Sequence, residues 1–415
     1  MREMKDSGVE WIGEIPVSWQ ILTIGSVFKV RNEKVNDTDY PPLSVAKGGV
    51  VPQMENVAKS DANDNRKMVL SNDFVINSRS DRKQSCGVSP MDGSVSLINT
   101  VLYPANGAPV IPAYLNYLLK NYGFAEEFYR WGHGIVADLW TTRWQEMKSI
   151  LLPIPSMGEQ QQILEAISEK TDKVDTLIAN VKAQIEKLKA YRQSVITEVV
   201  IKGLDPTVPM KDSGVAWIGE IPAHWEIKRG KALFKETEAR SADGSEELLT
   251  VSQYTGITPR SQKNVTMFEA LSLEGYKICE IGDIAANTMW LWAGAIGVSE
   301  YRGVISPSYN VYRQRGNDFI PRYLDHLLRA PMLVQGYASL STGIRASRLR
   351  LYPKDFLNIH FPVPPLEEQQ AILDALSSKC SAVDRLISIK QAKIEKLEQY
   401  KRSLIYEYVT GKKEA

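Results

Sequence analysis

Side chains that donate hydrogen bonds gather in a few segments of this sequence. In the first half they lie in "VAKGGVVPQ" (45–53), "SRSDRKQSC" (78–86) and "GIVADLWTTRW" (134–144). In the second half they lie in "VSQYTGITPR" (251–260) and "GIRASRLRL" (343–351), with an aromatic run, "TMWLWAGAI", at 288–296. Arginine and lysine donate to guanine edges or to phosphates, and glutamine pairs with adenine. These segments therefore indicate binding of double-stranded DNA rather than catalysis.

The residues that we expect to contact DNA carry a donor group or an aromatic ring. In the first half they are Lys47, Gln53, Arg79, Arg82, Lys83, Gln84 and Arg143. In the second half they are Gln253, Tyr254, Arg260, Gln262, Trp290, Arg345, Ser347, Arg348 and Arg350. The spacing of Arg345, Arg348 and Arg350 suggests that they do not all face one ligand. The three-residue step from Arg345 to Arg348 suits one face of a helix, whereas the two-residue step from Arg348 to Arg350 suits one face of a strand. Pairing with carboxylates such as Asp355 is the alternative for these arginines.

Two tryptophans, Trp290 and Trp292, alternate as they would along a strand edge. Tryptophans on one face of a strand either pack in the hydrophobic core or stack on a ligand, so both roles remain open.

Residues for catalysis or metal binding form no pattern. There is no glycine-rich nucleotide motif, no phosphate-binding loop and no N-P-P-Y or D-P-P-Y that would hold a flipped base. The histidines (His133, His224, His326 and His360) are isolated, and the cysteines (Cys86, Cys279 and Cys380) lie far apart without C-x-x-C. The sequence thus predicts no metal, no cofactor and no disulfide, which fits a reducing cytoplasm.

Two internal repeats organise the chain. "MKDSGVEWIGEIP" begins at Met4 and "MKDSGVAWIGEIP" begins at Met210, and we expect their tryptophans (Trp11, Trp19, Trp217 and Trp225) to be packing anchors. "LPIPSMGEQQQIL" (152–164) and "FPVPPLEEQQAIL" (361–373) form the second repeat. A duplication on this scale within 415 residues predicts two units, each large enough for its own core.

The Pro-x-Pro step of the second repeat enforces extended backbone, and a long helix follows each copy. Glycine and proline are absent from 159–202 and from 366–410, which predicts helices of about 60 Å. A heptad seam runs along them through Ile167, Val174, Val181, Leu188, Leu376, Val383, Ile394 and Leu397. We expect the helices to pair antiparallel, with packing of each helix on its own domain as the alternative.

The linker "VVIKGLDPTVPMKDSG" suggests how the copies join. Gly203 can cap the first long helix, and Pro206 prevents its restart. The second long helix ends at the chain terminus, where the motif at Met4 could close a ring.

The two globular segments share short matching sequences, and the stretches between these matches differ. "NDFVIN" (72–77) answers "GDIAAN" (282–287), Gly87-Val88-Ser89 answers Gly297-Val298-Ser299, and one helix is expected near 112–130 and near 321–338. Short strand-like runs around these points predict a loop-rich α/β (α+β) unit. A shared frame with divergent loops is typical of binding modules for different ligands; drift of unimportant loops is the alternative. The predicted boundaries are 1–152, 153–205, 206–361 and 362–415.

Composition sets two further limits. The chain is 43% hydrophobic and 24% charged, which is typical of globular proteins, and its longest apolar runs are too short for a membrane span. The formal net charge is +1, so a polyanion would have to be met by local patches. This near-neutrality is the best argument for the rival hypothesis, a coiled-coil adaptor whose two domains bind protein.

Taken together, the chain resembles the specificity subunits of type I restriction–modification systems. The resemblance covers the full length and rests on "MKDSGVEWIGEIPVSW" with its repeat, "PIPSMGEQQQI", "PVPPLEEQQAI", "GDIAANTMWLWAGAIGVS" and "TGIR". It implies two target-recognition domains and two spacer helices, related by a pseudo-twofold. Each domain would read half of a bipartite DNA site, while the helices fix the gap and dock two modification (methyltransferase) subunits. Partner subunits would supply methylation, translocation and restriction. Because the first domain has "NSRSDRKQSC" where the second has "NTMWLWAGAI", base contacts are not expected to carry over between the halves.

Overall fold

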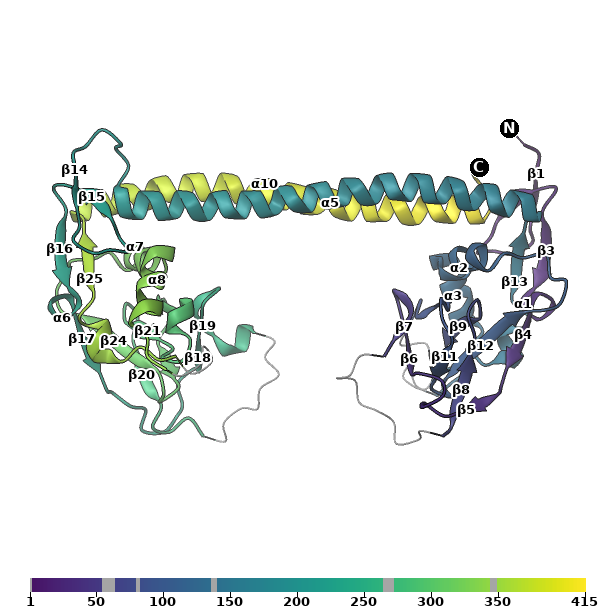
Figure 1. The fold of residues 1–415 in the computed structure, drawn as a ribbon, viewed down its shortest axis with the longest axis horizontal. Coiled ribbons are helices and arrows are strands. Elements are labelled where there is room, and N and C mark those ends of the chain that lie inside the picture. Colours follow the sequence, from purple (N-terminus) through teal and green to yellow (C-terminus); the bar gives the residue numbers. More distant parts are fainter. Residues whose placement is uncertain (1, 54–63, 80–82, 136–139, 264–271, 344–348) are drawn as a thin grey trace. The chain divides into compact units, whose positions relative to one another are not determined.

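The computed structural model describes residues 2–53, 64–79, 83–135, 140–263, 272–343 and 349–415. The chain divides into two compact units. The first combines Met1–Lys182 with Gln391–Ala415, and the second is Ala183–Lys390. Both divisions lie within the two long helices, α5 and α10, so each unit contains one end of each helix. Each unit combines runs of short strands with separate helices (Figure 1), which confirms the predicted α+β class.

The first unit is built around a four-stranded antiparallel sheet in the order β10-β9-β12-β4. Its strands are β4 (Phe28–Arg31), β9 (Phe74–Asn77), β10 (Cys86–Val88) and β12 (Asn99–Pro104). A second sheet contains β5 (Lys34–Val35), β8 (Arg66–Val69) and β11 (Gly93–Val95). Two-stranded ribbons pair β1 (Met4–Asp6) with β2 (Glu14–Pro16), β3 (Gln20–Thr23) with β13 (Leu151–Ile154), and β6 (Leu43–Ala46) with β7 (Gly49–Pro52).

The second unit repeats this plan with the sheet order β17-β24-β21-β22. These strands are β17 (Phe234–Thr237), β21 (Ile284–Ala286), β22 (Ile296–Val298) and β24 (Asn310–Gln314). The ribbons pair β14 (Met210–Asp212) with β15 (Glu220–Pro222), β16 (Glu226–Arg229) with β25 (His360–Val363), β18 (Leu249–Ser252) with β19 (Gly256–Pro259), and β20 (Lys277–Cys279) with β23 (Gly303–Ile305).

The single helix predicted for each unit is wrong, because each is broken into two. The first unit has α2 (Pro112–Lys120) and α3 (Tyr122–Arg130), and the second has α7 (Pro321–Leu328) and α8 (Pro331–Leu340). Asn121 adopts extended backbone and its side chain accepts the N–H of Phe124, so it caps α3. In the second unit Pro331 begins α8. The described residues also form one-turn helices: α1 (Ile24–Val27), α4 (Trp144–Met147), α6 (Gly230–Leu233) and α9 (Pro353–Phe356).

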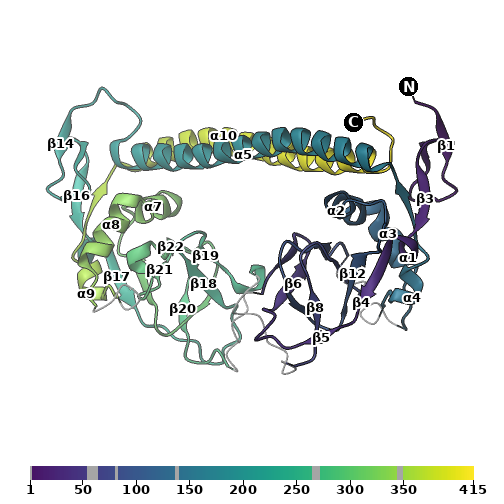
Figure 2. The ribbon, with the colours of Figure 1, turned by 45° about the vertical axis from the view of Figure 1, so that its right-hand side comes forward.

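The long helices are α5 (Met157–Lys202, 46 residues) and α10 (Leu366–Val409, 44 residues), and they lie side by side in both ribbon views (Figures 1 and 2). In the first unit Lys401 Nζ lies 2.7 Å from Asp175 Oδ1. In the second unit Arg192 Nε lies 3.2 Å from Asp384 Oδ1. Residue numbers rise along α5 from Asp175 to Arg192 while those of their partners on α10 fall from Lys401 to Asp384, so the two helices pair antiparallel, as predicted. No helix in the described part of the chain combines the length and apolar character needed to cross a membrane.

The heptad positions are mostly enclosed. Ile167, Val174, Val181, Leu376 and Val383 are buried, whereas Leu188, Ile394 and Leu397 are half-buried. Polar residues that interrupt the seam find partners on the other helix. Arg192 pairs with Asp384, and Lys390 Nζ donates to Gln184 Oε1 at 2.6 Å. Such polar pairs specify the register of a coiled coil at some cost in stability.

The first glutamine of each E-Q-Q repeat joins a long helix to its globular segment. Gln160 and Gln369 are completely buried. Gln369 Oε1 accepts the N–H of Ile320 at 2.9 Å, while its Nε2 donates to the carbonyls of Asp318 (2.8 Å) and Pro364 (2.9 Å). Gln160 makes the equivalent bonds to Ile111, Pro109 and Pro155. A local sequence repeat thus records a tertiary connection.

We predict that Gln369→Ala lowers the free energy of unfolding of the second unit by about 2–4 kcal/mol, because three buried backbone groups lose their partners. Gln370→Ala is the matched control, since the adjacent Gln370 is exposed and its Nε2 donates to Asp374 on its own helix. It should change stability by less than about 0.5 kcal/mol. Urea unfolding measures both variants, and equal losses would contradict the role given to Gln369.

Each globular segment also holds the far end of the other copy's helix. In the first unit Tyr114 Oη donates to the carbonyl of Val409 at 3.1 Å. In the second unit Tyr323 Oη donates to the carbonyl of Val200 at 2.7 Å. Tyr406 Oη also reaches the carbonyl of Trp11 at 2.9 Å. The C-terminal end of α10 therefore closes on the N-terminal motif, as the repeat suggested.

Packing at these ends explains the repeated motif. Trp11, Trp19 and Trp225 are buried, and Trp217 is half-buried against the core of the second unit. Gly203 has φ +76° and donates to the carbonyl of Val199, which ends α5 as predicted.

Candidate nucleic-acid interface

A strand that starts at an aspartate and ends at an asparagine positions one divergent loop in each unit. In the first unit this strand is β9, between Asp73 and Asn77. In the second it is β21, between Asp283 and Asn287. Both aspartates and both asparagines are buried, so their hydrogen bonds must be made within the unit.

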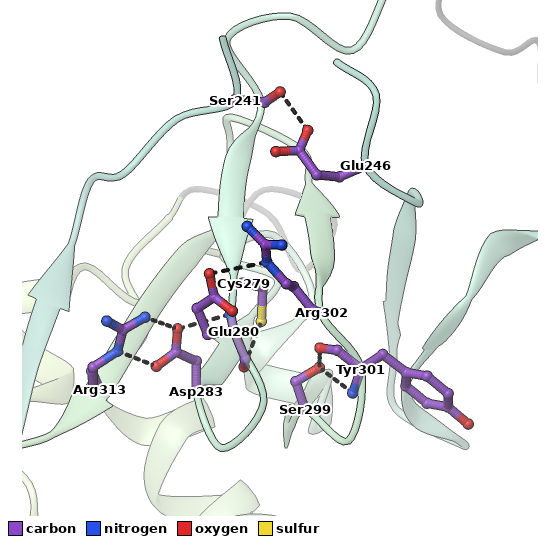
Figure 3. A network of polar contacts seen from close by, with 9 residues as sticks. All are labelled: Ser241, Glu246, Cys279, Glu280, Asp283, Ser299, Tyr301, Arg302 and Arg313. Atoms are coloured by element: carbon purple, nitrogen blue, oxygen red, sulfur yellow. Dashed lines mark hydrogen bonds and ion pairs between the residues drawn. The ribbon is translucent and has the colours of Figure 1, made fainter. Parts of the chain in front are cut away.

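The aspartate is clamped by an arginine in both units. Asp283 Oδ1 and Oδ2 each accept from Arg313 at 2.7 Å (Figure 3). Asp73 accepts from Arg31 at 2.7 and 3.1 Å. Arg31 lies on β4, whereas Arg313 lies on β24, so the clamp is kept although its arginine comes from a different strand. In both units hydrogen bonding to the aspartate raises the pKa of the arginine.

Figure 3 shows how the neighbouring turns of the second unit are fixed. Ser299 Oγ donates to the carbonyl of Tyr301 at 2.6 Å, and Arg302 Nε lies 3.3 Å from Glu280 Oε1. Ser89 makes the same turn contact with Met91 in the first unit. This shared Gly-Val-Ser segment is therefore structural.

The asparagine at the other end of the strand opens the divergent loop. Asn77 Oδ1 accepts the N–H of Arg79 at 3.0 Å, and Asn287 Oδ1 accepts the N–H of Met289 at 3.2 Å. The loop is closed by a backbone bond, from Asn77 to Ser85 or from Asn287 to Ala295. Loop sequences can therefore differ while their two ends stay fixed.

A second divergent segment is the turn of a β-ribbon. The β6–β7 turn contains Lys47 and Gly48, whereas the β18–β19 turn contains Gln253, Tyr254 and Thr255. Gly297 on β22 lets the β18–β19 ribbon approach the sheet, because a Cβ at this position would lie 3.4 Å from the Cα of Gly256. The same Cβ would lie 2.9 Å from Asp325 Oδ1.

The third divergent segment has a closed base in both units. His133 and Thr141 exchange backbone hydrogen bonds of 3.0 Å in the first unit, and Thr342 and Arg350 do the same in the second. Each unit thus presents three variable segments on one frame.

In the first unit the structure brings several predicted residues together. Gln53 and Arg79 line one cavity, and Arg79, Lys83 and Gln84 line its neighbour. Lys83 is held in place, because its Nζ lies 2.9 Å from Glu126 Oε1 and 4.3 Å from the ring centre of Tyr129. Lys47 and Arg143 are exposed but line neither cavity. Arg82 lies outside the described residues.

In the second unit the predicted residues are spread over two elements. Tyr254 is exposed at the ribbon turn, and Arg329 Nη2 donates to its carbonyl at 2.8 Å and to that of Gln253 at 3.5 Å. Arg260 and Gln262 follow on a short 3₁₀ helix, where Gln262 is exposed. Arg345, Ser347 and Arg348 lie outside the described residues, and Arg350 is exposed.

The expectation that Trp290 and Trp292 lie along a strand edge is wrong. Leu291–Ala293 form a 3₁₀ turn that ends at Gly294, with φ +88°. The two rings stack on each other, with centres 5.7 Å apart, and Trp290 remains 47% exposed. Without β-branched residues and with a glycine four positions on, the segment turns rather than extends.

No group of three or more metal-ligating side chains occurs among the described residues. Burial raises the pKa of Cys86 and of Cys279 to about 12, so neither thiol provides a nucleophilic thiolate near neutral pH. Burial also lowers the pKa of His326. Sequence reasoning missed Arg66, Lys67 and Arg329, because they belong to the frame and not to the divergent loops.

Comparison with known proteins places these features in context. Residues 225–399 match the type I restriction modification DNA specificity domain. A putative type I restriction enzyme MjaX specificity subunit from Methanocaldococcus jannaschii is 23% identical over 97% of this chain and 95% of that protein. The MjaVIII specificity subunit of the same organism is 26% identical over 64% of this chain and 62% of that protein. A chain solved in a study of assembly and conformational transition of the type I R-M system shares the fold, with a TM-score of 0.60 and 15% identity over 95% of this chain and 98% of that chain.

Proposed function

We propose that this chain is the DNA-recognition subunit of a type I restriction–modification complex, because its sequence is similar to the specificity subunits of such systems. Residues 1–152 and 206–361 each read one half of a bipartite site on double-stranded DNA. The segments 153–205 and 362–415 set the spacing between the halves and dock the modification subunits. The chain needs no cofactor of its own, since methylation, translocation and cleavage belong to its partners, and it acts in the cytoplasm.

The observation that carries this proposal is the contrast between frame and loops. The Asp–strand–Asn unit, the arginine clamp and the closed loop bases recur in both units. The loops on this frame change from cationic in "SRSDRKQSC" to aromatic in "TMWLWAGAI". A DNA site with two different half-sequences requires two units with different loops on a shared frame. An adaptor for two copies of one protein would instead repeat its contact residues in both units.

The helices show the opposite behaviour, and this supports two copies of one docking partner. Leu177 and Leu386 hold equivalent positions on α5 and α10, as do Tyr191 and Tyr400, and all four are exposed. Exposed apolar side chains at repeated positions suit a repeated contact, because isolated surface hydrophobics would not need to match. We therefore assign this surface to two modification subunits.

The proposal is tested by alanine variants of Arg260, Arg345 and Arg348, each assembled with the modification subunits. Their binding is measured against a panel of single-base site variants across a salt series. An arginine that reads guanine should cost about 1–3 kcal/mol and relax one base position in one half-site. An arginine that grips phosphate should weaken all sequences alike and reduce the salt slope by about one unit. We expect base reading for at least one of the three.

Arg302→Ala is the matched control, since Arg302 pairs with Glu280 on the shared frame. It should leave every base preference unchanged. If the three loop variants also preserve all preferences and the salt slope, the loops do not carry recognition and the protein-binding adaptor becomes the better hypothesis.

A further inference from the structure

One cavity of the first unit carries buried positive charge without a matching carboxylate among the described residues. The cavity, of about 370 Å³, lies between the β6–β7 ribbon, β8 and the ends of β9 and β12. Polar side chains dominate its lining: Ser44, Gln53, Arg66, Asn77, Arg79 and Asn99. Only Gln53 and Arg79 of these were expected from the sequence to bind DNA.

Arg66 is the central group of this cavity. Arg66 is only 7% exposed. It donates through Nε to Ser94 Oγ at 2.8 Å and through Nη2 to the Ser94 carbonyl at 3.1 Å. Its other N–H groups meet no acceptor among the described residues, and no described carboxylate pairs with it. Burial lowers the pKa of Arg66, with only partial compensation from Asp37.

The neighbouring Lys67 adds to the imbalance. Its Nζ donates to the carbonyl of Asn99 at 2.7 Å, and within the described part of the chain it has no acidic partner. Burial lowers the pKa of Lys67 as well. Asn99 Oδ1 is itself buried and accepts no hydrogen bond from any described residue.

The second unit avoids this imbalance, because the strand register puts Tyr276 in the place of Arg66 and pairs the lysine equivalent to Lys67 with a carboxylate. Lys277 occupies on β20 the place of Lys67 on β8, and it is 5% exposed. There, however, Glu238 Oε1 lies 2.8 Å from Lys277 Nζ. A buried cation without a paired carboxylate costs several kcal/mol, so among the described residues the fold accepts in one copy a cost that it avoids in the other. A ligand that supplies the missing negative charge accounts for this difference.

We propose that this cavity binds the phosphate group of a nucleotide. The N–H groups of Arg66 that meet no described acceptor, together with the guanidinium of Arg79, suit phosphate oxygens, because arginine pairs with phosphate in a bidentate manner. Asn99 Oδ1 would accept an N–H or O–H group of the same nucleotide, which a bare anion cannot offer. Only the assignment of that nucleotide to DNA rests on the proposed function, since a free nucleotide presents the same chemistry.

The first experiment measures thermal unfolding of the full chain at constant ionic strength. Inorganic phosphate should raise the melting temperature of the wild type by about 2 °C or more relative to chloride, and a deoxynucleoside monophosphate should raise it at least as much. Arg66→Met should abolish both shifts and melt above the wild type without phosphate, because it removes an unbalanced buried charge. Lys29→Met, at an exposed lysine of the same unit, should keep both shifts. Absent shifts in the wild type, or equal shifts in Arg66→Met, would overturn the site.

The second experiment identifies the source of the nucleotide. In the complex with modification subunits, Arg66→Met should reduce the slope of log affinity against log salt by about one unit for cognate and non-cognate DNA alike. Retained thermal shifts with an unchanged slope would assign the site to a free nucleotide and reject DNA. A complex that binds no DNA at all would reject the proposed function, while the thermal arm would still decide whether the cavity binds phosphate.

Discussion

A chain in which residues 21–152 are replaced by a second copy of residues 227–361 is expected to direct methylation to a symmetric site made of two copies of the second half-sequence. The joints are suited to this exchange, because the chain enters and leaves each globular segment through one two-stranded ribbon. Ile21 pairs with Pro153 in the first unit, and Ile227 pairs with Pro362 in the second.

The incoming segment also carries the groups that hold the helices. Tyr323 would take over from Tyr114 at the end of α10, and the N–H of Ile320 would replace that of Ile111 as the partner of Gln160. The effect should be a complete change of specificity with little change in stability. Methylome sequencing of cells that carry the chimaera and the modification subunits measures it. A folded chimaera that still modifies the parental asymmetric site would show that these segments do not carry recognition.

Removal of residues 404–415 should unfold the first unit, although most of that unit lies at the other end of the sequence. Leu404, Tyr408 and Val409 belong to the buried core of the first unit together with Trp19 and Phe28. Burial of three such side chains contributes roughly 1.5–3 kcal/mol each, and a whole domain is stable by only about 5–15 kcal/mol. The loss therefore approaches the stability of the unit.

Hydrogen exchange with mass spectrometry distinguishes the outcomes. In the truncated chain, amides of β3, β4, β9 and β12 should lose protection, while those of β17, β21 and β24 should keep it. A chain that ends at Lys412 is the control, since it retains the core residues and the contact of Lys412 with the carbonyl of Ile12. Loss of protection confined to α10 would mean that the first unit does not depend on the C-terminal segment.

The sequence alone predicted the features that follow from local rules. Proline and glycine act on their own neighbours, so the Pro-x-Pro steps and Gly203 marked where α5 and α10 start and where α5 ends. The heptad spacing is likewise local, and it indicated a helix pair. The repeat at Met4 and Met210 indicated two units and the closure of the chain ends, because a duplicated segment repeats its contacts.

Tertiary structure alone decided which distant groups satisfy one another. Nothing near Gln369 in the sequence indicates that it meets Ile320 and Asp318, and nothing near Arg313 indicates its clamp on Asp283. The break between α2 and α3 and the turn at Trp290 also escaped periodicity, since one capping side chain or one glycine outweighs a hydrophobic pattern. Most of all, the burial of Arg66 without a described carboxylate partner depends on which strands surround it. Burial and charge balance are properties of the assembled fold, and for that reason this cavity could not be read from the residues in order.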